Sequence, residues 1–359
     1  MKKYIAALCA VAMLAGCSSS TAATTATSAA STAAAASTAA AAASTGSLKI
    51  GIGSSTEISA KDATASDDGS IQVSTTYASV GLDGDTVKYV YFDIAQNKET
   101  FSAAGAVTSD LTAATLTKKE KGDNYGMKKA SAIGKEWYEQ AAALEQWAVG
   151  KTVSDFVNMA TTTNDEGSKI ADDADLKTGC TIGVDSFIEA FQKAADNAKE
   201  VSGVAKIGTG SKTTMDASDA TASDSGKVQS NVTYAVVALD KDGKVLFTQD
   251  DIAQDSAKFT AAGAIDGEAA ASPTKTEKGA DYGMKKASAI GKEWYEQNEG
   301  FEAWTVGKTA DEISGMATVT DDEGKVVTDD ADLKTTTTIG ISDFQSAVVT
   351  AINNAVEVK

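Results

Sequence analysis

A long internal repeat is the feature that most constrains how this 359-residue chain can fold. The fifteen residues GMKKASAIGKEWYEQ occur unchanged at 126–140 and at 283–297, an offset of 157 positions. The segments DATAS and DDADLKT recur at the same offset. This period is the size of a domain and far exceeds the repeating unit of a solenoid protein. The sequence therefore predicts two tandem domains of one fold, at 47–200 and at 204–359.

Each copy begins with predicted strands and continues with predicted helices. In the first copy, β-branched and aromatic residues over 71–92 surround a turn at Gly84, which predicts a hairpin. Apolar residues spaced by three or four over 127–147 predict one helix. Residues 181–184 are then predicted as a buried strand, followed by an amphipathic helix that begins at Asp185. Strands followed by segregated helices indicate an α+β fold with an antiparallel sheet in each copy.

The N-terminus is typical of a bacterial lipoprotein. A basic start is followed by an apolar run over 4–13 and by the lipobox Leu-Ala-Gly-Cys that ends at Cys17. This pattern predicts a signal peptide at 1–16 and lipidation of Cys17; the alternative is an ordinary secretory signal with a chance cysteine. After the cysteine, 17–46 is almost entirely Ala, Ser and Thr, which predicts a disordered tether. We expect the protein on the outer face of the cell membrane of a Gram-positive bacterium, lipid-anchored and extending into the cell wall.

The composition excludes several classes of function. The chain has a formal net charge of -18 and contains no His and no Arg, so nucleic acid is not an expected partner. The absence of His also excludes serine-type catalytic triads and histidine metal sites, and no metal site is expected. Cys9 is lost with the signal peptide and Cys17 carries lipid, which leaves Cys180 alone. A redox group in this protein would therefore have to be organic.

A run of small, mostly hydroxylated residues precedes the last predicted strand of each copy. It extends from Asp175 to Thr181 in the first copy and from Asp332 to Thr338 in the second. The residues of interest between these ends are Leu176, Thr178, Gly179 and Cys180, and in the second copy Leu333, Thr335, Thr336 and Thr337. A single run of this kind is usually strand packing, because Thr is a good β-former. Its recurrence at the same place in both copies favours a function.

The run resembles the flavinylation motif of FMN-binding domains, in which an ApbE-type flavin transferase joins FMN through its phosphate to the last threonine. With the lipobox, the tether and the repeated segment YGMKKASAIGKEWYEQ, the mature chain resembles the PplA-type extracellular electron-transfer lipoproteins. The resemblance implies two FMN groups, held by phosphoesters to Thr181 and Thr338. The chain departs from the family pattern at Cys180 and Thr337, where the family has Ala. A further hypothesis is that Asp175 and Asp332 orient the acceptor or a magnesium ion during transfer.

The resemblance also implies a function and a set of partners. Electrons would pass from a membrane NADH dehydrogenase and quinone pool, through the flavins, to extracellular acceptors such as ferric iron. The protein would be a redox carrier and not an enzyme with its own substrate. The alternative is a solute-binding or structural surface lipoprotein without a redox cofactor.

The repeated segment carries two pairs of lysines, Lys128 and Lys129 in the first copy and Lys285 and Lys286 in the second. One hypothesis places them beside the flavin, where positive charge would stabilise its reduced anionic form. The simpler interpretation is that the apolar stripe of this segment is the core face of a helix.

Overall fold

The computed structural model describes residues 46–358, which lie in one compact unit. The predicted signal peptide, the lipidated Cys17 and nearly all of the predicted tether lie outside the described residues. None of the described helices has the length and apolar character needed to cross a membrane.

The first copy builds a four-stranded antiparallel sheet. Its strands are β1 (Ser47–Lys61), β2 (Gly69–Asp83), β3 (Thr86–Phe101) and β6 (Lys199–Ser202). The first three form a meander, and β6 returns to pair with β1, which gives the order β3-β2-β1-β6. The predicted hairpin turn at Gly84 is confirmed as the connection between β2 and β3.

The second copy repeats this topology in a second sheet. Its strands are β7 (Lys206–Ser218), β8 (Gly226–Leu239), β9 (Val245–Phe259), β10 (Ile265–Asp266) and β13 (Val356–Glu357). Their order is β10-β9-β8-β7-β13, so the last strand again pairs with the first strand of its own copy.

The helices of each copy follow the third strand of its meander. In the first copy they are α1 (Lys118–Lys121), η1 (Gly122–Tyr125), η2 (Met127–Lys129), α2 (Trp137–Ala148), α3 (Val153–Val157), η3 (Leu176–Thr178) and α4 (Asp185–Asp196). In the second they are α5 (Lys275–Lys278), η4 (Gly279–Tyr282), η5 (Met284–Lys286), α6 (Trp294–Thr305), α7 (Ala310–Ser314), η6 (Leu333–Thr335) and α8 (Ser342–Asn353). Small hairpins pair β4 (Thr161–Thr163) with β5 (Lys169–Ala171) and β11 (Thr318–Thr320) with β12 (Val326–Thr328).

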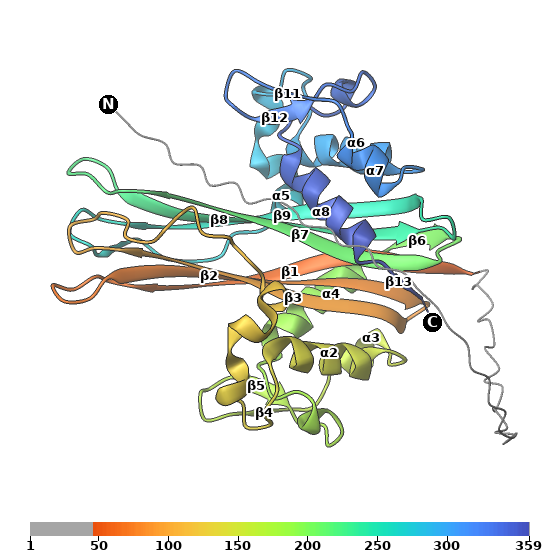
Figure 1. Ribbon diagram of the computed structural model, residues 1–359, viewed down its shortest axis with the longest axis horizontal. Helices are drawn as coiled ribbons and strands as arrows, with labels where there is room; N and C mark the ends of the chain where they lie inside the picture. The colour runs from red at the N-terminus through yellow and green to blue at the C-terminus, as the bar shows by residue number, and fades with distance from the viewer. Residues whose placement is uncertain (1–45, 359) are drawn as a thin grey trace, which may run out of the picture. The chain divides into compact units, whose positions relative to one another are not determined.

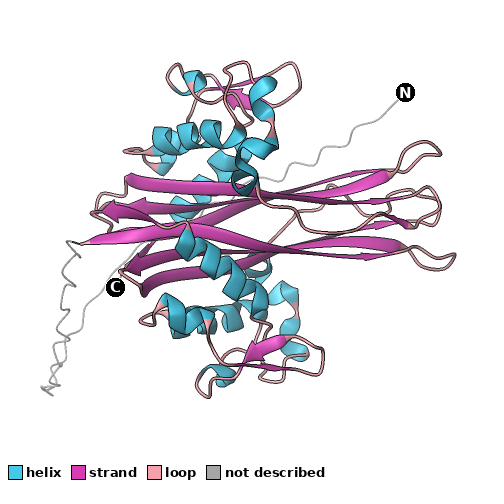
Figure 2. Ribbon diagram, turned by 180° about the vertical axis from the view of Figure 1, so that it is seen from behind, coloured by secondary structure: helices cyan, strands magenta, loops and turns pink. Residues whose placement is uncertain are grey.

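The two sheets pack face to face, and the helices cover their outer faces (Figures 1 and 2). On the outer face of the first sheet, α4 lies so close to β1 that a Cβ at Gly53 would stand 2.5 Å from the backbone N of Ala194. Glycine at this position permits the close approach. Between the sheets, side chains from both copies share one core that includes Ile50, Tyr77 and Tyr234. The result is an α+β molecule with a helix layer, two sheets and a second helix layer.

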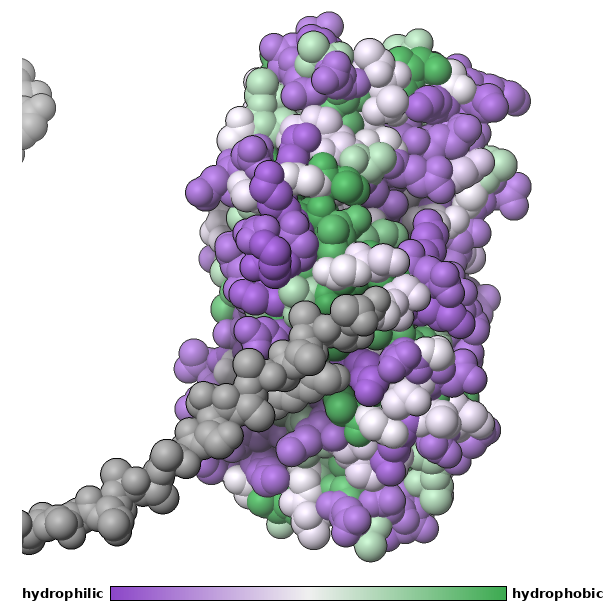
Figure 3. Space-filling model, turned by 90° about the vertical axis from the view of Figure 1, so that its right-hand side faces the viewer, coloured by the Kyte–Doolittle hydropathy of each residue, from purple (hydrophilic) through white to green (hydrophobic). Residues whose placement is uncertain are grey.

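Most large apolar side chains lie in these cores. Figure 3 shows a face that is largely hydrophilic, with apolar residues gathered in a band between polar margins. The large apolar side chains that remain exposed are Leu111, Leu116, Val149, Val306, Val319 and Val356 in the described part of the chain.

The prediction of one helix over 127–147 was wrong in its first half. The α-helix begins at Trp137, and the residues before it form a loop with a short 3₁₀ turn. Gly126 and Gly134 have φ angles of 77° and 64°, which an α-helix does not allow. At the start of α2 the backbone N–H of Glu136 donates to the carboxylate of Glu139 at 2.8 Å. The apolar residues of this loop, such as Met127, also pack against the core. Their spacing therefore resembles that of a helix although the backbone is not helical.

The prediction of a buried strand over 181–184 was also wrong. Gly183 makes an isolated bridge to Ile170, and no strand forms. The backbone N–H of Thr181 donates instead to a glutamine side chain, and that of Val184 donates to the carbonyl of Lys169. The predicted helix from Asp185 is confirmed as α4.

Candidate functional site

The two motif threonines make the same pair of hydrogen bonds. The backbone N and Oγ1 of Thr181 both donate to Oε1 of Gln140, at 2.8 and 3.1 Å. The same atoms of Thr338 donate to Oε1 of Gln297, at 2.9 and 3.0 Å. Each glutamine is the last residue of the repeated fifteen-residue segment. The two copies have therefore built one local geometry twice.

The repeated segment holds this glutamine in a fixed orientation. Gln140 is fully buried, and its Nε2 donates to Ser131 Oγ and to the carbonyl of Lys135, each at 3.2 Å. Gln297 repeats both bonds, to Ser288 Oγ and to the Lys292 carbonyl. Because the amide nitrogen is committed to the loop, the amide oxygen points to the threonine.

A buried glutamate supports the same loop. Glu136 Oε2 accepts a hydrogen bond from Met127 N at 2.8 Å, and Oε1 accepts one from Lys128 N at 3.0 Å. Glu293 accepts the equivalent bond from Met284 N at 2.8 Å. Sequence reasoning missed both glutamates and both glutamines. The signal that could have found them was the exact repetition of polar residues inside the segment, of which only the apolar stripe and the lysines were interpreted.

The other threonines of the second run are bound differently. Thr335 and Thr336 donate their hydroxyls to backbone carbonyls within the run, and the buried Thr337 donates to the carbonyl of Gln297 at 2.6 Å. In the first run, Thr178 likewise donates to the carbonyl of Asp175. Thr338 is thus the member of the four-threonine run whose hydroxyl matches that of Thr181; Thr181 is half-buried and Thr338 is exposed.

The remaining predicted motif residues fall into two groups. Leu176 and Leu333 are buried in the cores of their copies, as is Cys180, and they position the run. Asp175 and Asp332 are exposed at the start of their 3₁₀ turns, where the preceding Asp173 and Asp330 accept the backbone N–H bonds.

Two positions near the threonines change together between the copies. A Cβ at Gly179 would stand 2.8 Å from the Cβ of Ala143 on α2. In the second copy the same positions hold Thr336 and Gly300, and a Cβ at Gly300 would stand 2.8 Å from that of Thr336. In each copy, one of the two facing positions is therefore a glycine. This lets the backbone of the motif lie equally close to the helix in both copies.

The charges around the first run include one nearby ammonium. Lys135 Nζ lies 3.9 Å from the position of a Cβ at Gly179. Burial raises the pKa of the Cys180 thiol to about 11, against an opposing effect of Lys135. Cys180 is therefore a neutral thiol near pH 7, and it is not a reactive thiolate. Lys128 and Lys129 are exposed.

Each copy also holds a lysine between two aromatic rings. Lys118 Nζ lies 5.1 Å from the ring centroid of Tyr125 and 5.4 Å from that of Trp137. Lys275 lies in the same way over Tyr282 and Trp294. Burial lowers the pKa of each lysine to about 8. Trp137 and Trp294 are buried core residues.

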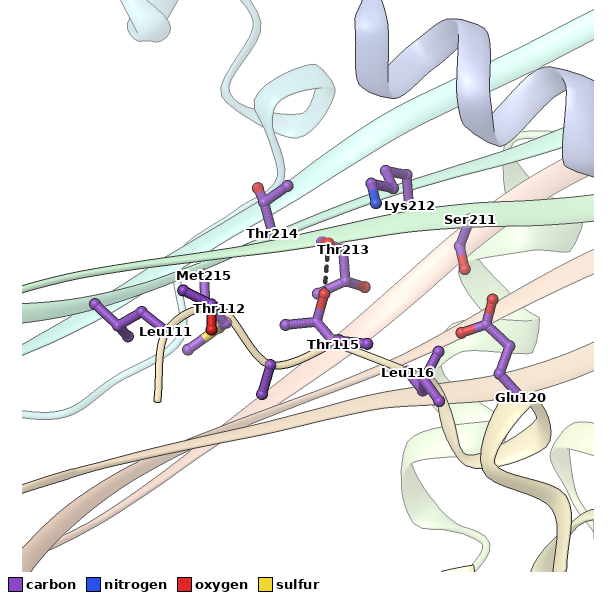
Figure 4. Close-up of a pocket in the computed structure, with 12 residues that line it drawn as sticks. Leu111, Thr112, Thr115, Leu116, Glu120, Ser211, Lys212, Thr213, Thr214 and Met215 are labelled. Carbon is purple, nitrogen blue, oxygen red and sulfur yellow. Dashed lines mark hydrogen bonds between the residues drawn. The ribbon is translucent and has the colours of Figure 1, made fainter. Parts of the chain in front are cut away.

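Two cavities lie away from the threonines. The cavity of about 410 Å³ in Figure 4 is bounded by the loop at 111–116, Glu120 and strand β7, where Thr115 Oγ1 donates to the carbonyl of Thr213 at 2.7 Å. A second, of about 440 Å³, lies beside α3 and α4. Neither cavity is lined by Thr181 or Thr338.

Part of the chain is similar to a protein named chlorophenol reductase from Desulfitobacterium hafniense, with 32% identity over 117 residues. The similarity covers 24% of this chain and 35% of that protein, so the chain spans well under half of the relative's length. No family model matches the chain, and no solved structure matches it.

Proposed function

We propose that this protein is a redox carrier that holds FMN covalently on Thr181 and Thr338. The observation that carries the proposal is the recurrence of one threonine–glutamine geometry, built in both copies by an identical segment. A stretch conserved only for core packing would not need the same buried polar residues in both copies.

The residues present suit a phosphoester of FMN. Thr181 is half-buried and Thr338 is exposed, which suits access by a phosphate, and the proton of each hydroxyl is directed to the glutamine oxygen. The oxygen lone pairs are then free to face the incoming group. Lys135 lies close enough to the first run to pair with a phosphate charge. Bound FMN would supply one- and two-electron chemistry, while the protein would set its position and potential.

The source and destination of the electrons are inferred from the resemblance of the chain to flavin lipoproteins. We infer transfer from a membrane NADH dehydrogenase and quinone pool to extracellular acceptors such as ferric iron, after loading by an ApbE-type transferase. The partial similarity to a reductase supports a redox-related role. An anchor on Cys17 would keep the carrier on the outer face of the membrane.

Mass spectrometry of the chain produced with and without an active flavin transferase tests this function. We expect two additions of about 438 Da, the mass of FMN less water, mapped to Thr181 and Thr338. Thr181→Ala and Thr338→Ala should each remove one addition, whereas Thr178→Ala should remove none, because that hydroxyl is bound to a backbone carbonyl. No addition with a transferase active on another substrate would favour a structural or solute-binding lipoprotein.

A further inference from the structure

The first copy has an apolar region between β3 and α2 with a single ion pair at its edge. Phe92 and Ala141 are fully buried there, and the Phe92 ring stacks on that of Phe156 with centroids 5.5 Å apart. The carboxylate of Glu145 accepts a hydrogen bond from Phe92 N at 2.7 Å. The same carboxylate binds the ammonium of Lys119 at 2.6 Å. In the first copy, a lysine of the chain itself therefore neutralises the glutamate.

The second copy keeps this carboxylate and loses the positive charge. The glutamate is retained as Glu302, which accepts a hydrogen bond from Asp250 N at 2.9 Å. The lysine of the first copy is replaced by Thr276, the stacked phenylalanine by Asp250, and the alanine by Asn298. One cation has therefore been exchanged for a second carboxylate and an amide, which together with Glu302 we call the Asp250 cluster.

The oxygens of this cluster lack donors. Asp250 and Asn298 are 2% and 3% exposed, and neither oxygen of the Asp250 carboxylate nor Oδ1 of Asn298 has a hydrogen-bond partner in the described part of the chain. The Asn298 amide interacts with that carboxylate without coming within hydrogen-bond distance of it, and its Nδ2 donates to the Asp250 carbonyl at 3.1 Å. Buried oxygens without donors are strongly unfavourable unless something positive satisfies them.

The neighbouring hydroxyls do not supply the missing donors. Thr305 Oγ1 donates to the carbonyl of Glu302 at 2.6 Å, and the hydroxyl of Thr248 is paired with that of Thr305 at 2.7 Å. Among the charges that act on Glu302, Lys199 is positive, and Glu299 and Asp251 are negative. Lys199 forms no salt bridge with Glu302 within residues 46–358, so no ammonium group contacts the cluster directly there.

We propose that the Asp250 cluster binds a divalent metal cation of the calcium class, in the place that the Lys119 ammonium occupies in the first copy. Carboxylate and amide oxygens are the ligands that Ca²⁺ prefers, and two carboxylates balance its charge. Glu302 is partly exposed, which leaves a path for the ion and room for water ligands. The described residues hold no group of three or more His, Cys, Asp or Glu suited to a metal. The proposed site therefore combines two carboxylates with the amide oxygen of Asn298, which has no hydrogen-bond partner in the described part of the chain.

Calorimetric titration and thermal unfolding of the full chain, with CaCl₂ or with EDTA, test the proposal. We expect one Ca²⁺ per chain, a Kd on the order of 10⁻⁴–10⁻³ M as in other extracellular oxygen sites, and a higher Tm in Ca²⁺ than in EDTA. Asp250→Asn should weaken binding about tenfold or more, since affinity follows the ligand charge.

Thr276→Lys is the sharper variant, because it restores the lysine of the first copy. It should raise the Tm in EDTA and abolish the response to Ca²⁺, whereas the matched Thr276→Val should retain that response. An unchanged Ca²⁺ response in Thr276→Lys would overturn the proposal, because it would assign binding to the acidic surface. Equal Tm values of the wild type in Ca²⁺ and EDTA, or stabilisation by Na⁺ alone, would also overturn it.

Discussion

Two buried glutamines decide where the candidate acceptor hydroxyls lie. Gln140 joins three parts of the first copy: the loop at Ser131, the backbone at Lys135, and the motif at Thr181. A buried amide with all its donors and acceptors used is expensive to replace, because its partners are left unsatisfied. Its role is to position the threonine, since an amide oxygen is too weak a base to remove the hydroxyl proton.

Replacement of Gln140 by Leu should affect the first threonine site and leave the second one intact. We expect loss of flavin from Thr181 with retention on Thr338, and a loss of about 1–3 kcal/mol of unfolding free energy from the unsatisfied groups. Peptide mass spectrometry measures the first and urea unfolding the second. Gln297→Leu is the matched control and should show the reverse pattern. Full occupancy of Thr181 in Gln140→Leu would show that the glutamine does not position the acceptor.

Burial raises the pKa of Glu302 to about 8. This shift predicts that the stability of the fold depends on pH. A carboxyl whose pKa is higher in the folded chain stabilises the fold below its unfolded pKa, and this contribution is lost as the pH rises through the folded value. In EDTA, the contribution of Glu302 should therefore fall between its ordinary pKa of 4.5 and about pH 8.

Glu302→Gln isolates this effect, because Gln keeps an oxygen to accept the N–H of Asp250. Urea unfolding across this pH range in EDTA should show a flatter profile for the variant than for the wild type. Parallel profiles would contradict the assignment of this titration to Glu302.

At the scale of elements, the helix that follows the repeated loop determines which residues the motif can hold. Helices α2 and α6 lie against the motif through Ala143 and Gly300, which face Gly179 and Thr336. The second copy tolerates a threonine in the run only because its helix has a glycine opposite.

The contact between α2 and the first motif predicts a rescue. Gly179→Thr alone should destabilise the chain by about 1–3 kcal/mol, because the new Cβ would overlap that of Ala143. Ala143→Gly in the same chain should recover most of this loss, since the pair then matches the second copy. A double-mutant cycle from urea unfolding measures the coupling, and additive effects would contradict it.

At the scale of the whole described unit, the two copies depend on each other. Their sheets share a core, and Phe101 stacks on Phe259 with ring centroids 4.1 Å apart. Polar contacts also cross between the copies, including Tyr77 Oη to Ser211 Oγ at 2.9 Å. The helical layers with the two threonines lie on opposite sides of the paired sheets (Figure 1). The two candidate flavin sites therefore face different surroundings.

Cutting the chain between the copies should expose this shared core. Residues 47–203 alone are expected to aggregate or to self-associate through the inner face of the first sheet, which carries Ile50, Tyr77 and Phe101. Light scattering after size-exclusion chromatography measures this, with the full chain as the control. A monomeric fragment with cooperative unfolding would show that each copy is stable alone.

Local signals in the sequence were enough to predict much of the fold. Strand-forming residues around Gly84 predicted the hairpin of β2 and β3, and the amphipathic pattern after Asp185 predicted α4. The class of antiparallel sheet with helices followed from the order of these elements. These features depend on short-range propensity and periodicity, which a sequence displays directly.

Only the tertiary structure decided how the motif and the repeated segment are used. Residues 127–136 have the apolar spacing of a helix, yet they fold as a loop because Glu136 and Gln140 bind their backbone and side chains. Residues 181–184 have strand-forming residues, yet Gln140 takes the N–H of Thr181 that a strand would use. The packing of one sheet on the other, and the exchange of Lys119 for the Asp250 cluster, likewise join residues far apart in the chain. Such long-range partners satisfy buried polar groups, and no local pattern reveals them.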